Sequence, residues 1–327
     1  MFCIRIHLRT LIQPNRIYIL IYTFAPMPTL NVISYFDKST VKHLRLPFSY
    51  HLMPVFLFAL SQATNVNWQN TIVAFCILHL LIYPSSNGYN SYQDKDETSI
   101  GGLKNPPKVS ENLFYATLLL DIVGVVCALF VSVYFSIFVL LYVLISRAYS
   151  YRKLRLKKYA LIGFLTVFLF QGAFTYLMVS SAVTTFSVET FFNLNTIICM
   201  SIASLFIGSV YPLTQIYQHN ADKQDGVTSI SYKLGYIGTF IFSSTVFAAA
   251  TALLFYYFDS KHQRIEVFLF FILMLPVVLT LFNWFNNVRK STTNANFENT
   301  MKMNLLASSC MNIYFLVLIL NNNYSWF

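Results

Sequence analysis

The chain has 327 residues, of which 56% are hydrophobic and only 10% are charged. This composition excludes an ordinary soluble domain and is typical of a protein that crosses the membrane several times. The net charge of +10 does not indicate a nucleic-acid-binding protein, because the basic residues punctuate apolar segments instead of covering a solvated fold. The five cysteines are scattered, mostly inside apolar runs, and they predict neither a disulfide framework nor a zinc site.

The first 45 residues differ from the rest of the chain. Residues 17–36 are apolar but include Pro26 and Pro28, and arginines precede them. A signal peptide, an interfacial segment and an upstream extension ahead of a start at Met27 are all open, and the last two are favoured because no small-residue cleavage site is convincing. We expect an N-terminal extension over residues 1–45 and one membrane domain over residues 46–327.

Nine apolar stretches follow, most of them near the length of roughly 20 residues that a helix needs to cross a bilayer. They predict an all-α, nine-helix membrane bundle with spans at about 47–63, 68–84, 111–131, 133–147, 158–180, 192–217, 235–257, 265–286 and 303–321. If the segment before the first span is cytoplasmic, every basic residue except Lys261 and Arg264 lies on the cytoplasmic side. This distribution obeys the positive-inside rule.

Two polar islands interrupt the apolar sequence, at residues 83–107 and 215–226. The predicted topology places both on the cytoplasmic side, together with the basic loop at residues 149–158. Carboxylate and amide oxygens are the ligands that hard cations such as Mg²⁺ prefer. We therefore predict a magnesium site with ligands from both islands, namely Asn90, Asp94, Asp96, Gln218, Asp222 and Asp225.

The first island resembles a motif of the UbiA superfamily of intramembrane aromatic prenyltransferases. The family motif N-D-x-x-D-x-x-x-D matches at Asn90 and Asp94, while Ser91 and Thr98 stand where the family has aspartates. Residues four apart share one face of a helix, so Asn90 and Asp94 are expected to point the same way.

The basic loop and the second island extend the resemblance, which covers about residues 47–321. Tyr149 and Lys153 match a Y-x-x-x-K segment of the family. The second family motif, D-x-x-x-D, falls on Gln218 and Asp222, with Gly226 after it. Glutamine replaces the first aspartate and supplies an oxygen without a charge.

The resemblance implies a prenyl transfer reaction, in which Mg²⁺ and basic side chains stabilise the diphosphate that leaves an allylic carbon. The chain is then an enzyme that moves an isoprenoid chain from a prenyl diphosphate donor to an aromatic or lipid acceptor within membrane lipids. The residues expected to act most directly in catalysis are Asn90, Asp94, Asp222 and Lys153. The expected diphosphate contacts are Lys104, Arg152, Lys153 and Lys233.

Other functions stay open at this point. A diphosphate-using membrane transferase with a non-aromatic acceptor would share the same polar islands. A transporter is less favoured, because Asp121 is the one clear carboxylate inside a predicted span. The departures at Ser91, Thr98 and Gln218 also leave room for a catalytically inactive isoprenoid-binding protein.

Several polar residues inside predicted spans have two interpretations each. Asp121 could line an acceptor pocket or stay neutral and hydrogen-bonded. Gln171 and Gly172 mark either a polar cavity or a close helix contact. His79 is expected to be a packed, hydrogen-bonded histidine rather than a ligand or base.

Overall fold

The structure is a computed structural model that describes residues 35–185, 187, 189 and 193–324. Within these residues it is all helical, with one isolated bridge between Ile100 and Leu103 and no strand. Residues 1–34 lie outside the described part of the chain. Residues 38–44 form the helix α1, which packs against α4 and α5. The domain boundary at residue 45 stays a prediction.

The helical elements of the described residues follow one another along the chain with short connections. They are α1 (Lys38–Leu44), η2 (Leu46–Leu52), α2 (Met53–Ser61), α3 (Trp68–Cys76), η3 (Ile77–Ile82), α4 (Tyr83–Asp94), α5 (Asn112–Ala128), α6 (Val133–Ser150), η4 (Leu156–Lys158), α7 (Ala160–Val167), η5 (Phe168–Phe174), α8 (Thr175–Val183), α10 (Leu194–Thr214), η6 (Ile216–Gln218), α11 (His219–Gln224), α12 (Ile230–Ser260), α13 (Arg264–Lys290), η7 (Thr292–Asn294) and α14 (Phe297–Tyr324).

Seven helical runs of the described chain are long and apolar enough to cross a membrane, so the predicted count of nine spans is not confirmed. They are Trp68–Asp94, Val133–Ser150, Ala160–Val183, Leu194–Gln224, Ile230–Ser260, Arg264–Lys290 and Phe297–Asn322. The predicted span at 47–63 instead forms the 3₁₀ helix η2 followed by the nine-residue helix α2. The predicted span at 111–131 becomes α5, whose 17 residues end at Ala128.

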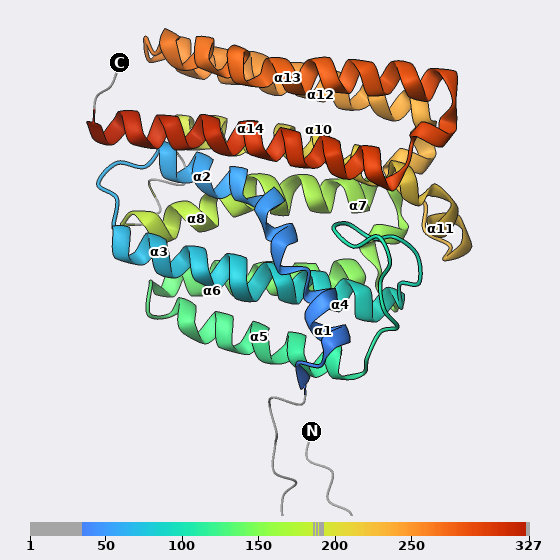
Figure 1. The fold of residues 1–327 in the computed structure, drawn as a ribbon. Helices are drawn as coiled ribbons and strands as arrows, with labels where there is room; N and C mark the ends of the chain where they lie inside the picture. Colours follow the sequence, from blue (N-terminus) through green and yellow to red (C-terminus); the bar gives the residue numbers. More distant parts are fainter. Residues whose placement is uncertain (1–34, 186, 188, 190–192, 325–327) are drawn as a thin grey trace, which may run out of the picture. The chain divides into compact units, whose positions relative to one another are not determined.

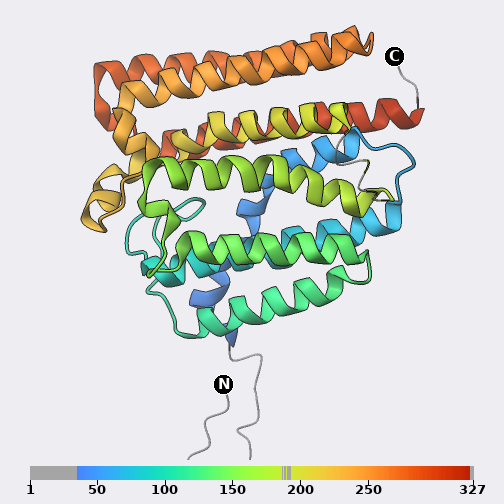
Figure 2. The same ribbon diagram turned by 180° about the vertical axis from the view of Figure 1, so that it is seen from behind.

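The long helices run side by side and stack into a bundle (Figures 1 and 2). At one edge α12 packs between α13 and α10, and α13 also packs on α14. The helices α2 and α8 lie next, in contact with each other, and α6 connects them to α4 and α5 at the other edge. Consecutive helices therefore alternate in direction, and their connecting segments fall at the two ends of the bundle.

The helix that carries the first island is longer than the sequence predicts. The predicted span ends at Pro84, but the helical run continues to Asp94. Proline lacks the N–H that would complete the α-helical ladder. The π-helical segment η3 precedes it, and the N–H of Tyr83 bonds the carbonyl of Leu78, five residues back. This wider turn carries the helix past the proline, so α4 holds the polar residues on a regular helix.

Three of the ambiguous polar positions receive definite surroundings. Asp121 is hydrogen-bonded, as one of its two interpretations predicts: the Nε of Arg147 lies 2.8 Å from Asp121 Oδ2, and the two side chains form an ion pair. A Cβ on Gly172 would lie 2.3 Å from the Cα of Ser204, which confirms a close helix contact there. His79 is buried and stacks on Phe75 with ring centroids 4.3 Å apart, as expected for a packed histidine.

Candidate active site

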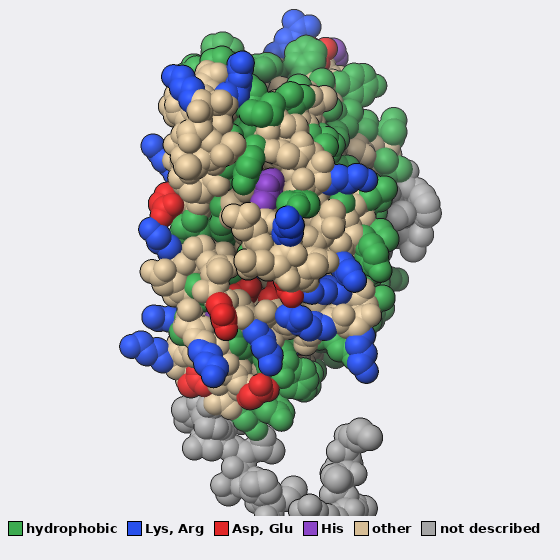
Figure 3. All heavy atoms as spheres, turned by 90° about the vertical axis from the view of Figure 1, so that its right-hand side faces the viewer, with side chains coloured by type: hydrophobic (Ala, Val, Ile, Leu, Met, Phe, Trp, Pro, Cys, Tyr) green, Lys and Arg blue, Asp and Glu red, His purple; other side chains and the backbone are tan. Residues whose placement is uncertain are grey.

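Three segments that are distant in the sequence meet at one end of the bundle, as the predicted topology requires. Arg152 donates from Nε to the carbonyl of Gln93 at 2.5 Å, which joins the basic loop to the end of α4. Its Nη1 lies 3.4 Å from Asp225 Oδ1, which joins the same loop to the second island. Figure 3 faces this end of the molecule, where acidic and basic side chains gather together.

Asn90 and Asp94 share one face of α4, as their spacing predicts. The amine of Lys157 donates to Asn90 Oδ1 at 2.8 Å and is ion-paired with Asp94. The hydroxyl of Ser150 also donates to Asn90 Oδ1, at 2.8 Å. The Asn90 amide is therefore held in one orientation by two donors from the basic loop and the end of α6.

Arg155 links the two islands. Its guanidinium lies 3.1 Å from Asp94 Oδ1 and is also ion-paired with Asp225. Burial opposes the charge of Arg155, but the hydrogen bond to Asp225 and the charge of Asp94 raise its pKa. The same partner lowers the pKa of Asp225, although burial acts in the opposite direction. Both groups are therefore charged at neutral pH.

Asp96 is the least satisfied carboxylate of the site. Burial, reinforced by the charge of Asp94, raises its pKa to about 6. Its Oδ2 is buried and has no hydrogen-bond partner among the described residues. Arg45 faces it electrostatically, and the Arg45 guanidinium is held by the carbonyls of Asn87 at 2.9 Å and Gly101 at 3.1 Å. Asp96 thus has a free oxygen in a polar environment.

The basic loop lies between the two islands and contacts both of them. Asp222 lies in α11 and interacts electrostatically with Lys157, Asp94 and Asp225. Gln218 ends the short helix η6 and stands immediately before α11. Gln218 and Asp222, although four residues apart, are therefore separated by the change from η6 to α11.

The four basic residues predicted to contact a diphosphate lie in different places. Arg152 is at the carboxylates, and Lys104 pairs with Glu298 of α14 at an exposed position. Lys153 and Lys233 are exposed, and their side chains form no ion pair or hydrogen bond with the described residues. The structure brings Arg155 and Lys157 to the carboxylates instead. A sequence signal existed for Arg155, because Tyr151 and Arg155 repeat the spacing of Tyr149 and Lys153.

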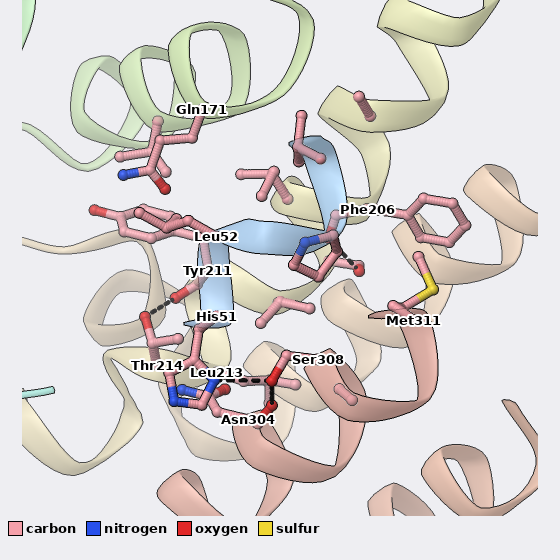
Figure 4. A pocket seen from close by; sticks show the side chains of 18 of the residues that line it. His51, Leu52, Gln171, Phe206, Tyr211, Leu213, Thr214, Asn304, Ser308 and Met311 are labelled. Carbon is pink, nitrogen blue, oxygen red and sulfur yellow. Dashed lines mark hydrogen bonds between the residues drawn. The ribbon is translucent and has the colours of Figure 1, made fainter. Parts of the chain in front are cut away.

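An apolar cavity of about 340 Å³ lies inside the bundle and meets this polar site. Asn90 lines it at the polar end, together with Arg45 and Tyr149, whose hydroxyl lies 2.5 Å from that of Tyr211. Deeper walls are largely apolar and aromatic, formed by Phe58, Phe170, Phe206, Phe247, Met274, Leu281 and Phe315. Gln171 also lines the cavity, so its sequence position does mark a polar point in the interior (Figure 4).

Comparison with known protein families gives one decisive match. The model of the UbiA prenyltransferase family matches residues 51–306, well over half of the chain. The chain belongs to the UbiA prenyltransferase family. This membership confirms the predicted family and the predicted enzyme class, a membrane transferase of prenyl groups. A comparison with curated protein sequences gave no match.

Solved UbiA-like structures share the fold at low sequence identity. A UbiA homolog from Archaeoglobus fulgidus bound to GPP and Mg²⁺ is 14% identical, with a TM-score of 0.62 over 86% of this chain and 99% of that chain. The apo UbiA homolog from Aeropyrum pernix K1 is 16% identical, with a TM-score of 0.61 over 83% and 97%. A digeranylgeranylglyceryl phosphate synthase is 18% identical, with a TM-score of 0.54 over 86% and 97%.

The donor set of this UbiA family member suits a cation that also takes ligands from its substrate. Among the described residues, no three His, Cys, Asp or Glu side chains are close enough to form a complete metal site. Magnesium usually needs only one or two protein carboxylates and takes its other ligands from water and phosphates. The partnerless buried oxygen of Asp96, beside Asp94 and Asn90, fits such a role.

Proposed function

We propose that the protein transfers an isoprenoid chain from an allylic diphosphate to an acceptor, assisted by Mg²⁺. The observation that carries the proposal is the joining of an acidic and basic cluster to a largely apolar cavity, through Asn90. The GPP and Mg²⁺ bound to the Archaeoglobus fulgidus homolog support this assignment. The chain of an isoprenoid fits the apolar cavity, and its diphosphate fits the charged end.

The carboxylates are proposed to hold the cation. Asp94, Asp96 and Asp222 supply the charge, while Asn90, Gln218 and Asp225 supply or orient further oxygens. Bound Mg²⁺ would neutralise the negative charge that develops on the diphosphate oxygens as the allylic bond breaks. The carboxylates already give this cluster negative charge, and the cations Arg155 and Lys157 of the basic loop pair with them.

The basic side chains are proposed to grip the diphosphate. Arg152, Arg155 and Lys157 project from one loop toward the carboxylates. Arginine matches phosphate oxygens with a planar fork, whereas lysine acts as a compact charge. The exposed Lys104, Lys153 and Lys233 stay candidates from the resemblance, and Lys153 stays the family's counterpart in register.

The cavity walls are proposed to protect the allylic cation. Aromatic faces attract a cation, and apolar side chains keep water from capturing it. Phe58, Phe170, Phe206 and Phe315 line the cavity and meet both needs. We propose an aromatic or quinone-precursor ring as the acceptor, as the family resemblance implies.

We also propose that η2–α2 and α5 complete nine membrane crossings, with the charged end in the cytoplasm. The turn after α5 leads directly into α6, which packs along it. If α6 alone crossed, the loops at 95–111 and 151–159 would lie on opposite sides. Arg152 and Gln93 are hydrogen-bonded, which supports the crossing of α5 and α6 as a pair. The excess of basic residues at this end then favours the cytoplasm.

Pyrophosphate release by the purified protein in lipid nanodiscs tests the function. With geranylgeranyl diphosphate and a phenolic acceptor we expect release that depends on both acceptor and Mg²⁺. Asp94→Asn should lower the rate by at least about 100-fold, because it removes a charged ligand of the cation that neutralises the leaving diphosphate. Asp259→Asn is the matched control. Asp259 lies in the last turn of α12, at the end distant from the site, and pairs with Arg264 of α13. Release without Mg²⁺, or unchanged release in Asp94→Asn, would contradict the proposal.

A further inference from the structure

The cavity contains a second polar group, separate from the carboxylate cluster. His51 of η2 and Asn304, Ser308 and Thr214 of α14 and α10 lie together at its wall (Figure 4). The Nδ1 of His51 lies 2.8 Å from the hydroxyl oxygen of Ser308. None of these residues belongs to the two family motifs or to the basic loop.

The hydrogen bonds of Ser308 determine which nitrogen of His51 carries the proton. The Ser308 hydroxyl oxygen lies 2.6 Å from the main-chain carbonyl of Asn304. So short a contact between two oxygens needs the single hydroxyl hydrogen between them, and Ser308 must therefore accept from His51. His51 then carries its hydrogen on Nδ1, and Nε2 has a free lone pair. Nε2 forms no hydrogen bond with any described residue.

The other lining residues restrict what this lone pair can meet. Arg45 is the one charged side chain among the described residues that line the cavity, and no carboxylate lines it. The two Nη atoms of Arg45 already donate to the carbonyls of Asn87 and Gly101. The Nε of Arg45 has no partner, but the charge of Arg45 faces Asp96 and Asp94, which balance it. An acceptor molecule with its own carboxylate or phosphate would have to compete with these two carboxylates for the one cation that lines the cavity, which is costly.

We infer that His51, oriented by Ser308, binds the hydroxyl group of an uncharged acceptor and takes its proton during prenyl transfer. This inference rests on the proposed function and specifies its second substrate as a neutral phenol, quinol or alcohol. Among the lining side chains, the imidazole offers a nitrogen lone pair that can accept a proton.

The step balances as follows. The allylic carbon–oxygen bond of the donor breaks, and its electron pair leaves with pyrophosphate. The acceptor forms the new bond to the allylic carbon, and its hydroxyl proton passes to Nε2 of His51. When a ring carbon is the nucleophile, the resulting dienone regains its aromatic ring by moving the ring proton to the oxygen.

Binding measurements in nanodiscs test the acceptor class without relying on turnover. The probes are methylhydroquinone, its dimethyl ether, gentisate and methyl gentisate. We expect wild-type protein to bind methylhydroquinone about tenfold more tightly than the dimethyl ether, which cannot donate a hydrogen bond. Methyl gentisate should likewise bind at least about tenfold more tightly than the charged gentisate.

The variant His51→Asn separates the two nitrogens. Its amide N–H can replace Nδ1 toward Ser308, but nothing replaces Nε2. We expect it to lose the preference for methylhydroquinone over the dimethyl ether and to lower transfer by about 100-fold or more. His262→Asn is the matched control, because His262 is exposed at the turn after α12 and does not line the cavity.

Binding of geranylgeranyl diphosphate with Mg²⁺ is measured in parallel and should be equal in wild type and both variants. Failure of that donor binding in wild type would overturn the proposed function, and this inference with it. With donor binding intact, three results overturn the inference alone: an unchanged preference in His51→Asn, gentisate binding equal to its methyl ester, or no binding of any of the four probes.

Discussion

Asp94 is a buried carboxylate of the charged end that contacts two cations. It ends α4 as a carboxylate that contacts both Arg155 and Lys157, and its side chain is only 12% exposed. When a diphosphate and its metal ion bind, the two cations can turn to the diphosphate and the carboxylate can turn to the metal ion. Residues of the motif and of the basic loop therefore act as one ionic network, in which each side chain has more than one partner.

Asp96 predicts a pH dependence of magnesium binding. Its pKa of about 6 is raised above the ordinary value of 3.8 by burial and by Asp94, so the charged form is lost as the pH falls through 6. We expect the Mg²⁺ concentration for half-maximal activity to rise by up to about tenfold per pH unit below 6. Asp96→Asn should show a weaker dependence, which separates Asp96 from titration of the diphosphate. Equal pH profiles for the two proteins would contradict the assignment.

The same pKa has the opposite effect on folding. A carboxyl whose pKa is higher in the folded protein stabilises the fold at low pH, and this contribution disappears as the pH rises through about 6. Magnesium binding, which favours the charged form, offsets that loss. At neutral pH Asp96 therefore contributes less to the stability of the fold but provides a charged ligand for the metal ion.

Lys157 contacts a carboxylate of the site in the structure, whereas Lys153 matches the family motif in sequence, so mutating each compares these two indications of function. Lys157 contacts Asn90 and Asp94, whereas Lys153 is exposed and contacts none of the described carboxylates. We expect Lys157→Gln to lower kcat/KM for the donor by about 100-fold, and Lys153→Gln by less than about tenfold, because a buried charge stabilises phosphate more than an exposed one. Steady-state kinetics with varied donor concentration measures both. A larger effect at Lys153 would favour the family register over the contacts seen in the structure.

At the scale of elements, two irregular helices shape the interior. The π-helical segment η3 allows α4 to continue past Pro84, and the π-helical segment η5 presents Gln171 to the cavity. Opposite η5, the main-chain N–H of Ala173 donates to the hydroxyl oxygen of Ser204, at 2.9 Å. Interruptions of this kind in a membrane helix are tolerated where neighbouring helices satisfy the backbone. Here they lie beside the site.

The contact between η5 and α10 predicts a strong effect of a single methyl group. In Gly172→Ala the new Cβ would lie 2.3 Å from Ser204 Cα and 2.7 Å from its nitrogen, so the two helices must separate. We expect a loss of stability of about 1–3 kcal/mol or more, seen as a lower unfolding temperature in detergent. Gly238→Ala is the control, because its new Cβ would meet the Leu234 side chain at 3.3 Å. Equal unfolding temperatures for the two variants would show that the η5–α10 contact is not tight.

At the scale of the whole described chain, the bundle has a charged end and an opposite end with few charges. Contacts at the charged end join α4, the basic loop and α11, while the turns after α5 and α12 lie at the other end. The nine crossings proposed above would account for this arrangement, with two of the nine helical passes short.

Cysteine labelling tests the crossing of α5 and the orientation together. In a background without the native cysteines, single cysteines replace Phe130, His262 and Lys223. Phe130 is 83% exposed in the turn after α5. We expect a membrane-impermeant reagent to label Phe130→Cys and His262→Cys from one side and Lys223→Cys from the other, the cytoplasmic side. Labelling of Phe130→Cys from the same side as Lys223→Cys would show that α5 does not cross.

The sequence by itself determined the membrane class, the positions of most long helices and the family. These follow from apolar run length and from motif spacing, both of which are local properties of the chain. It also predicted that Asn90 and Asp94 share a helical face, because i and i+4 geometry needs no tertiary contact. The predicted count of nine spans is not confirmed, since Pro47 and Pro54 in the first apolar run and the short reach of α5 shift helix bounds that composition does not resolve.

Only the tertiary structure decided which cations reach the carboxylates. Lys153, Arg155 and Lys157 look equivalent in a basic loop, yet the left-handed backbone of Arg155 and the packing of the loop turn the last two inward. Likewise, Asp121 found its partner 26 positions away in Arg147. His51 met Ser308 across 257 positions, a separation at which no sequence pattern carries information. Charge and hydrogen bonding select partners by distance in space, so these choices exist only once the helices have packed.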